Sequence, residues 1–214
     1  MRERKEKPIS MMTDVKINAE TCINAEYKIN ANERIDDLCR DNLKLIQNTD
    51  VFCFGMDAVL LSTFAKAGKN DKVLDLGTGN GIIPILMQAK NPGGMYTGLE
   101  IQDISFNLAA RNVSLNNLSD HVNMVQGDIK EASRIFGGAS FNVVTSNPPY
   151  MNENHGIVNT ESAKAIARHE LLCSLEDVVR EASKCLKVKG HMYMVHRPSR
   201  LVAVSYTHLT LPTT

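Results

Sequence analysis

The sequence has no excess of charge of either sign, because 24 lysine and arginine residues balance 24 aspartate and glutamate residues. Such a chain is not expected to coat nucleic acid or a membrane surface nonspecifically, so any polyanion site must be a local patch. No apolar run approaches the roughly 18 residues of a membrane span, and no apolar segment follows the charged residues 1–8. We therefore expect a soluble protein that is not exported.

Paired cysteines are also lacking. The five cysteines are odd in number and never stand in a C-x-x-C pair, which disfavours both a disulfide framework and a zinc knuckle. The expectation is reduced thiols in a cytoplasm and no bound metal ion. A length of 214 residues fits a single domain with a core large enough for an enzyme.

The first 32 residues differ from the rest of the chain. Isoleucine recurs at every sixth position, at Ile17, Ile23 and Ile29, within a short repeat over residues 17–32. This spacing puts the isoleucines on one side of a strand but at different angles around a helix, and the repeat is too short to stack into a solenoid. We interpret residues 1–32 as a poorly ordered leader.

From residue 72 onward, short apolar runs alternate with longer amphipathic stretches. Leu175, Val178, Val179 and Ala182, for example, share one face of a helix. Strands and helices that alternate at this spacing predict βαβ units, and hence an α/β, Rossmann-like fold in which helices cover both faces of a parallel sheet. The expected strands are residues 72–76, 95–100, 122–126, 141–146 and 191–195, and the expected helices are residues 57–67, 81–90, 103–116 and 175–187.

Residues 73–82 have the pattern of a strand that runs into a glycine turn and opens a helix. In an open parallel sheet, ligands bind beyond the carboxyl ends of the strands, so Asp75 and the glycines fall where a cofactor should lie. Gly77, Gly79 and Gly81 form G-x-G-x-G, whereas dinucleotide sites use G-x-G-x-x-G, and a carboxylate here would repel a pyrophosphate. Asp75 suits an ammonium group or an ordered water, as the methionine part of S-adenosylmethionine requires.

Two further carboxylates end the next two predicted strands. Glu100 is placed to accept hydrogen bonds from both ribose hydroxyls of the cofactor, and Asp128 is placed to accept one from the amine of its adenine. Ile101 and Ile129 would form apolar walls. A single aspartate at a strand end is often only a helix cap or a turn residue. Carboxylates at three consecutive strand ends nevertheless favour a site for S-adenosylmethionine.

The fourth predicted strand ends in Ser-Asn-Pro-Pro-Tyr, residues 146–150. The two prolines fix φ and remove two backbone donors, so the side-chain oxygen of Asn147 and the carbonyl of Pro148 form a rigid pair of acceptors. Such a pair can bind both N–H groups of a planar amine and favour a pyramidal nitrogen that attacks the sulfonium methyl group. We expect Asn147, Pro148 and Tyr150 to be the catalytic residues, with Tyr150 stacked on the base.

The acceptor motif leaves the substrate open. Adenine N6, guanine N2 and a glutamine side-chain amide all present a planar amine, and none needs a general base or a metal ion before attack. His155 and His169 are therefore interpreted as loop and packing residues. A noncatalytic RNA-binding protein on the same fold is the alternative outside the enzymes, and the intact carboxylates argue against it.

Several stretches resemble the bacterial tRNA1(Val) adenine-N6-methyltransferases, which act on an adenosine beside the anticodon. The resemblance implies the seven-stranded methyltransferase sheet, S-adenosylmethionine as cofactor, tRNA as substrate and a turn at residues 54–57 that helps to close the cofactor pocket. The matching stretches are residues 33–38, 52–61, 73–85, 97–102, 127–132, 144–151, 165–170 and 193–198. The residues expected to bind the cofactor are Phe54, Gly55, Asp75, Gly77, Thr78, Gly79, Gly81, Glu100, Ile101, Asp128, Ile129 and Asn147.

Two related activities remain alternatives. A glutamine N5-methyltransferase for release factors shares Asn-Pro-Pro-Tyr but would carry a helical N-terminal domain, which residues 1–50 are too polar and repetitive to supply. An rRNA guanine N2-methyltransferase is separable only by its product. For the leading interpretation we expect a cytoplasmic monomer that binds tRNA and neither a membrane nor a metal ion.

The methyltransferase domain is expected to occupy residues 33–200. Residues 201–214 carry no charged side chain and resemble translated read-through, so we expect a truncated gene product that lacks the last antiparallel hairpin of the sheet. Residues 191–195 would then form an uncovered edge strand prone to aggregation. Cations that could hold RNA phosphates are Arg2, Arg4, Lys5, Lys7, Arg168, Arg197 and Arg200.

Overall fold

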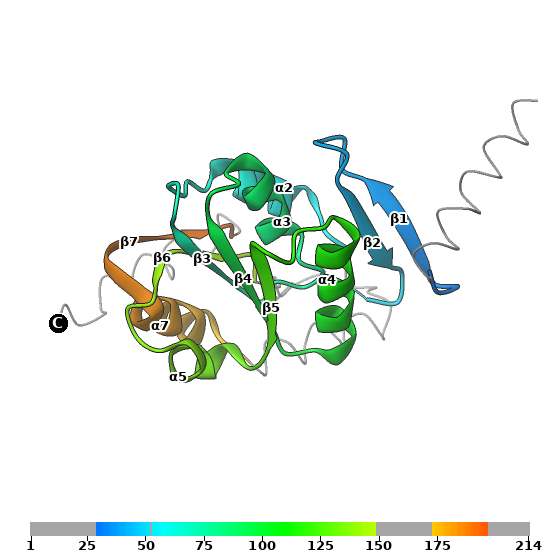
Figure 1. The fold of residues 1–214 in the computed structure, drawn as a ribbon. Helices are drawn as coiled ribbons and strands as arrows, with labels where there is room; N and C mark the ends of the chain where they lie inside the picture. Colours follow the sequence, from blue (N-terminus) through cyan, green and yellow to red (C-terminus); the bar gives the residue numbers. More distant parts are fainter. Residues whose placement is uncertain (1–28, 52, 149–172, 197–214) are drawn as a thin grey trace, which may run out of the picture.

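The centre of the molecule is a five-stranded sheet with the strand order β5-β4-β3-β6-β7 (Figure 1). The computed structural model describes residues 29–51, 53–148 and 173–196. Every neighbouring pair in this sheet is parallel, as the βαβ pattern predicts. The strands are β3 (Lys72–Leu76), β4 (Met95–Glu100), β5 (Val122–Gln126), β6 (Phe141–Ser146) and β7 (Leu186–Met194).

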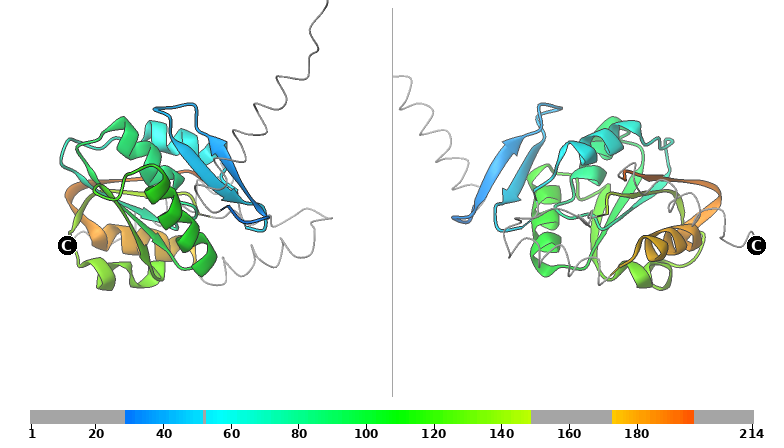
Figure 2. Two further views of the ribbon diagram at one scale, coloured as in Figure 1. Left: turned by 45° about the vertical axis from the view of Figure 1, so that its right-hand side comes forward. Right: turned by 180° about the vertical axis from the view of Figure 1, so that it is seen from behind.

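Helices cover both faces of the sheet (Figure 2). On β3, Val73 packs into one apolar cluster, while Leu74 and Leu76, whose side chains point to the opposite face, pack into a second. The first cluster contains side chains of α2 (Met56–Phe64), α3 (Ile82–Lys90) and α4 (Asp103–Leu115). The second contains side chains of α5 (Ala132–Phe136), which follows the 3-10 helix η1 (Ile129–Glu131), and of α7 (Leu175–Cys185).

Four of the five predicted strands have the predicted bounds, and the ends of the helices differ from prediction by at most three residues. The exception is the junction of α7 and β7. Leu186 continues the apolar period of the helix, yet it begins the strand by pairing with Phe141. Two backbone hydrogen bonds fix this junction, from Ala139 N–H to the carbonyl of Lys184 and from Ser140 N–H to that of Cys185, both 2.9 Å long.

An antiparallel hairpin precedes the sheet and was not predicted as strands. It consists of β1 (Glu33–Asp37) and β2 (Lys44–Asn48), and it lies beside α4 in Figures 1 and 2. Leu45 and Ile46 of β2 are buried. Asn32, ahead of the expected domain boundary, accepts a hydrogen bond from Thr49 N–H at 2.9 Å.

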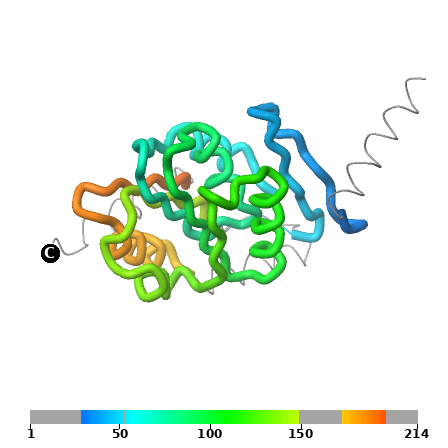
Figure 3. Tube along the Cα trace, viewed as in Figure 1, coloured from blue at the N-terminus to red at the C-terminus, as the bar shows by residue number. Residues whose placement is uncertain are grey.

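The chain can be followed in Figure 3 from this hairpin through α2 into β3 and onward along the sheet. Among the described residues, β7 is the last strand at one edge of the five. An edge left uncovered at residues 191–195 stays a prediction, because residues 197–214 lie outside the described ranges. Within the described ranges, no helix combines the length and the apolar character needed to cross a membrane.

Candidate active site at the carboxyl ends of the strands

The glycine turn after β3 is held against the end of β4. The backbone is left-handed at Gly77, Gly79 and Gly81, with φ of 74°, 59° and 82°, a conformation that costs a side chain steric strain. Gly77 N–H and Thr78 N–H both donate to the carbonyl of Leu99 at 3.0 Å. The turn therefore lies beyond the carboxyl edge of the sheet and ends at the first residue of α3.

Glu100, the last residue of β4, ties this turn to the start of α4. It is 6% exposed, and one carboxylate oxygen accepts from Gly79 N–H while the other accepts from Gln102 N–H, each at 2.9 Å. A carboxylate oxygen can accept a second hydrogen bond. Glu100 can therefore shape the turn and still accept ligand hydroxyls, which is compatible with its expected role.

Asp75 is buried beneath the turn and is 1% exposed. Its Oδ1 accepts from the Thr145 hydroxyl at 2.7 Å, whereas its Oδ2 and the Thr78 hydroxyl make no hydrogen bond of good geometry. Burial raises the pKa of Asp75 to about 6; the hydroxyls of Thr78 and Thr145 oppose the rise and the charge of Glu100 adds to it. A buried carboxylate with one unpartnered oxygen is costly for a fold and is typical of functional sites.

Gly98 on β4 makes room for this arrangement. It lies opposite Asp75 in the register of β3 and β4, and a Cβ there would come within 2.7 Å of the Thr78 methyl group and 2.6 Å of the Met124 sulfur. A Cβ on Gly79, by contrast, would meet no atom within 4 Å. The turn thus packs tightly against β4 on one side and has open space at Gly79.

Asp128 and Ile129 lie at the end of the next strand. Gly127 N–H donates to the carbonyl of Glu100 at 3.0 Å, and the Ile129 Cδ1 atom is 3.5 Å from the point where a Cβ of Gly77 would lie. Asp128 Oδ1 accepts from Lys130 N–H at 2.9 Å and so caps the 3-10 helix η1. An aspartate at a strand end is often only a cap or turn residue, and Asp128 does have this role. Its binding to the adenine of a cofactor stays a prediction.

The proposed acceptor residues follow β6, next to the end of β3. The Ser146 hydroxyl donates to the carbonyl of Leu76 at 2.9 Å, and Val195 N–H donates to the carbonyl of Ser146 at 3.4 Å. Asn147 and Pro148 come directly after this anchored residue and are partly exposed. The fold therefore brings them to the same edge of the sheet as the glycine turn.

Phe54 and Gly55 precede α2, where Gly55 is the N-cap residue. Phe54 packs against the cluster that contains α2 and α3, and its N–H donates to Gln47 Oε1 of β2 at 3.2 Å. Ile101 is 38% exposed. Contact of these three residues with a cofactor stays a prediction. The hydrogen bond between Phe54 and Gln47 could not be predicted, because residues 44–48 were not expected to form a strand.

Other predictions fall outside the described residues. These are Tyr150, His155 and His169, most of the leader, residues 201–214 and the seven cations expected to hold RNA. Among the residues that the structure describes, no group of three or more His, Cys, Asp or Glu side chains could hold a metal ion.

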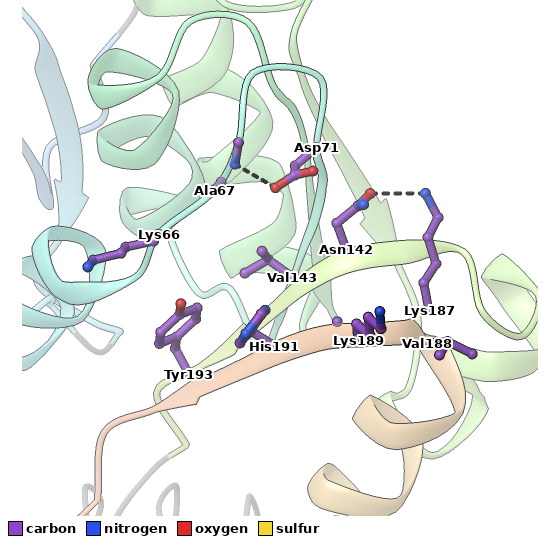
Figure 4. A pocket seen from close by; sticks show the side chains of 12 residues that line it. Lys66, Ala67, Asp71, Asn142, Val143, Lys187, Val188, Lys189, His191 and Tyr193 are labelled. Carbon is purple, nitrogen blue, oxygen red and sulfur yellow. Dashed lines mark hydrogen bonds between the residues drawn. The ribbon is translucent and has the colours of Figure 1, made fainter. Parts of the chain in front are cut away.

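A pocket of about 500 Å³ lies away from the glycine turn, near the amino ends of β3 and β6. Lys66, Asp71, Asn142, Lys187 and His191 are among its lining residues (Figure 4). Lys187 Nζ donates to Asn142 Oδ1 at 3.0 Å. The glycine turn and the carboxylates at the other end of the strands do not line it, so it is not the predicted site.

Residues 42–204 match the family model of the methyltransferase small domain. The chain belongs to this family. Membership confirms the expected α/β methyltransferase fold, to which the glycine turn after the first strand of the parallel sheet conforms. The matched range includes the glycine turn, the carboxylates Asp75, Glu100 and Asp128, and Asn147.

Two curated relatives of this chain carry the same name, tRNA1(Val) (adenine(37)-N6)-methyltransferase. The protein of Porphyromonas gingivalis (strain W83) is 29% identical over 153 residues, which cover 69% of this chain and 59% of the relative. The protein of Flavobacteriaceae bacterium (strain 3519-10) is 25% identical over 150 residues, which cover 70% and 61%. This chain therefore spans about three fifths of the length of the relatives it matches.

Solved structures agree on the fold of this chain. A predicted O-methyltransferase from Agrobacterium tumefaciens has a TM-score of 0.55 at 20% identity and covers 71% of this chain and 66% of its own. An S-adenosylmethionine-dependent O-methyltransferase from Thermotoga maritima also has a TM-score of 0.55, at 15% identity, and covers 75% and 51%. At these identities the likeness is one of fold alone.

Proposed function

We propose that this protein transfers a methyl group from S-adenosylmethionine to the exocyclic N6 amine of an adenosine in tRNA. The observation that carries the proposal is the meeting of Glu100, the orphaned oxygen of Asp75 and the open space at Gly79 beyond the strand ends. The names of the curated relatives support an adenosine in tRNA as the substrate. By that similarity the target is the anticodon-loop adenine of valine tRNA. A tRNA substrate would place the protein in the cytoplasm, and we expect it to act as a monomer.

The residues at the turn fit the chemistry of this cofactor. Two buried carboxylates disfavour a phosphate and suit a ligand that brings an ammonium group and hydroxyls. Glu100 would bind the ribose hydroxyls, and Asp75 would bind the amino group of the methionine part, directly or through a water. Asp128 would accept from the adenine amine, between Ile101 and Ile129. When bound, the cofactor supplies an electrophilic methyl group on its sulfonium.

Asn147 and Pro148 would hold the acceptor. The side-chain oxygen of Asn147 and the carbonyl of Pro148 would each accept one N–H of the substrate amine, which orients the nitrogen lone pair toward the methyl group. Support for this role comes from the anchored Ser146, because its hydrogen bond to Leu76 fixes the start of the acceptor motif beside β3. Tyr150 would stack on the base.

Methyl transfer can be tested directly with this chain. It is incubated with methyl-labelled S-adenosylmethionine and with total tRNA from cells that lack the modification, and the tRNA is digested to nucleosides. Label in N6-methyladenosine supports the proposal. Label in N2-methylguanosine with rRNA, or in glutamine of a release factor, would replace it with one of the two related activities. Absence of binding to S-adenosylhomocysteine, the cofactor product, would refute the proposed cofactor site itself.

A further inference from the structure

One face of α4 points toward the N-terminal hairpin and the glycine turn. It carries Ala109, Asn112 and Asn116, whose spacing of three and four residues places them in line on one side of the helix. The side-chain amides of Asn112 and Asn116 each form two hydrogen bonds to the backbone of β2, as the backbone of a neighbouring strand would. Asn112 Oδ1 accepts from Ile46 N–H at 2.7 Å and its Nδ2 donates to the Ile46 carbonyl at 3.0 Å.

Asn116 repeats this pattern one helical turn further on. Its Oδ1 accepts from Lys44 N–H at 2.9 Å, and its Nδ2 donates to the Lys44 carbonyl at 2.7 Å. The two amides therefore replace the strand partner that the outer edge of β2 would otherwise need. They dock the hairpin on α4 beside the sheet, as seen in Figures 1 and 2.

The two asparagines differ in their third hydrogen bond. Asn116 Nδ2 donates to the carbonyl of Asn112 within α4 at 2.7 Å. Asn112 Nδ2 instead donates to the carbonyl of Asn80 in the glycine turn at 2.9 Å. Asn112 is fully buried at 0% exposure, so water cannot replace any of its three bonds.

Packing beside Asn112 supports the same connection. A Cβ on Gly81 would lie 3.2 Å from the Cβ of Ala109, so α4 contacts the end of the turn as well as its centre. Asn80 is itself 6% exposed. The turn is thus bounded by Glu100 at Gly79 and by α4 at Asn80 and Gly81.

We infer that Asn112 is a positioning residue of the cofactor site, and that it couples docking of the β1–β2 hairpin to the shape of the glycine turn. This inference rests on the proposed function for its ligand. The glycine turn and β2 both form hydrogen bonds to the buried amide of Asn112, so they cannot move independently. A ligand that favours one conformation of the turn must therefore also change the stability of β2 docking. Asn112 contacts neither ligand nor substrate in this role and acts through the backbone of Asn80.

The two asparagines offer a matched pair of variants. When ionised, Asn112→Asp and Asn116→Asp each keep the acceptor for a β2 N–H and each lose two donor bonds, one of them to a β2 carbonyl. Only Asn112→Asp removes the bond to the turn. We expect its dissociation constant for S-adenosylhomocysteine, measured by calorimetry, to rise by about tenfold or more, while Asn116→Asp stays within about threefold of wild type.

Kinetics separate positioning from general damage. Asn112→Asp should raise the KM for S-adenosylmethionine and leave kcat at saturating cofactor within about threefold of wild type. Equal losses of affinity in both variants would overturn the inference, since docking of the hairpin alone would then explain the effect. Failure of the wild-type chain to bind S-adenosylhomocysteine would overturn the proposed function and this inference with it.

A second measurement needs no variant and decides the question if Asn112→Asp does not fold. Hydrogen exchange of the wild-type chain is followed by mass spectrometry with and without S-adenosylhomocysteine. Because coupling is reciprocal, peptides that contain residues 43–48 should gain protection together with peptides from the turn at residues 77–82. Protection confined to the turn would overturn the inference.

Discussion

Asp75 makes the stability of this protein depend on pH in a direction that is unusual for a carboxyl group. Its pKa is raised from 3.8 to about 6 by burial, so the folded state takes up a proton near pH 6 and the unfolded state only near pH 4. Between these values the folded state binds more protons than the unfolded state. The free energy of unfolding therefore gains a contribution from Asp75 as the pH falls from 7 toward 4, and loses it as the pH rises through 6.

The magnitude follows from the two pKa values. A rise of about two units corresponds to about 3 kcal/mol at 1.36 kcal/mol per unit, and Asp75 is buried enough that solvent does not screen this away. Residue 75 is uncharged at every pH in the Asp75→Asn variant. The variant therefore lacks the pH-dependent contribution of Asp75 to the free energy of unfolding. Its amide can still accept from the Thr145 hydroxyl, but one amide N–H would be left where Oδ2 has no partner. That loss costs about 1–3 kcal/mol and does not change with pH.

Urea unfolding separates the two effects. The free energy of unfolding of wild type and Asp75→Asn is measured at pH 8, 7, 6 and 5, and the difference between them is plotted against pH, which cancels every other titrating group that the substitution leaves alone. The variant should gain stability relative to wild type as the pH rises, by about 1.4 kcal/mol between pH 5 and pH 8, because this range crosses only the upper part of the interval between the two pKa values. A difference that stays constant over this range would refute the reasoning, because Asp75 would then titrate alike in both states.

The same variant should lose the ligand. If Asp75 holds the amino group of the cofactor, Asp75→Asn removes a charge-assisted hydrogen bond, and the affinity for S-adenosylhomocysteine should fall by about tenfold or more at pH 8. A variant that is more stable and binds more weakly would show that the buried carboxylate is kept for function. A variant that gains stability and keeps full affinity would leave Asp75 without a role at the site.

Three further substitutions test the neighbouring residues. Glu100→Gln places an amide N–H against a backbone N–H at Gly79 or Gln102, and should weaken S-adenosylhomocysteine binding about 10- to 100-fold by calorimetry, since bonds to a charged group contribute about 1.5–3 kcal/mol; unchanged affinity would contradict it. Gly98→Ala overpacks Thr78 and should lower the free energy of urea unfolding by about 1–3 kcal/mol, unlike a neutral surface change. Asn147→Ala should reduce methyl transfer by about 100-fold or more with cofactor affinity within a fewfold, and lost binding would instead assign Asn147 to the cofactor.

The strands and the glycine turn could be predicted because their signals are local. Apolar runs of strand length and glycines directly after one of them lie within about ten residues of sequence. Glu100 could be placed at the same site since parallel strands end at one edge of the sheet. This rule predicts that Glu100 lies near the glycine turn. It does not predict that Glu100 accepts a hydrogen bond from Gly79 N–H, 21 residues away.

The hairpin could not be predicted by the same reasoning. β1 reads Glu-Arg-Ile-Asp-Asp, which has too few apolar residues to indicate a strand. Its stability depends on partners far along the chain: Ile46 pairs with Asn112, 66 residues away, and Glu33 forms an ion pair with Arg111 at 2.7 Å. An asparagine inside a helix gives no sign in the sequence that its amide serves the edge of a distant strand.

The two buried carboxylates show how the same chemistry serves different tasks at one site. Both oxygens of Glu100 accept from backbone N–H groups of the protein itself, so Glu100 sets the shape of the glycine turn. Asp75 has one oxygen paired and one without a hydrogen bond, so it stores a cost that a donor from a ligand can remove. A ligand then gains binding energy at Asp75, where one carboxylate oxygen lacks a hydrogen bond. Little reorganisation is needed at Glu100, whose oxygens are already hydrogen-bonded. The division explains why removal of Glu100 should disturb the turn itself, whereas removal of the Asp75 charge should leave the turn intact and, above pH 6, offset the cost of the unpaired amide N–H.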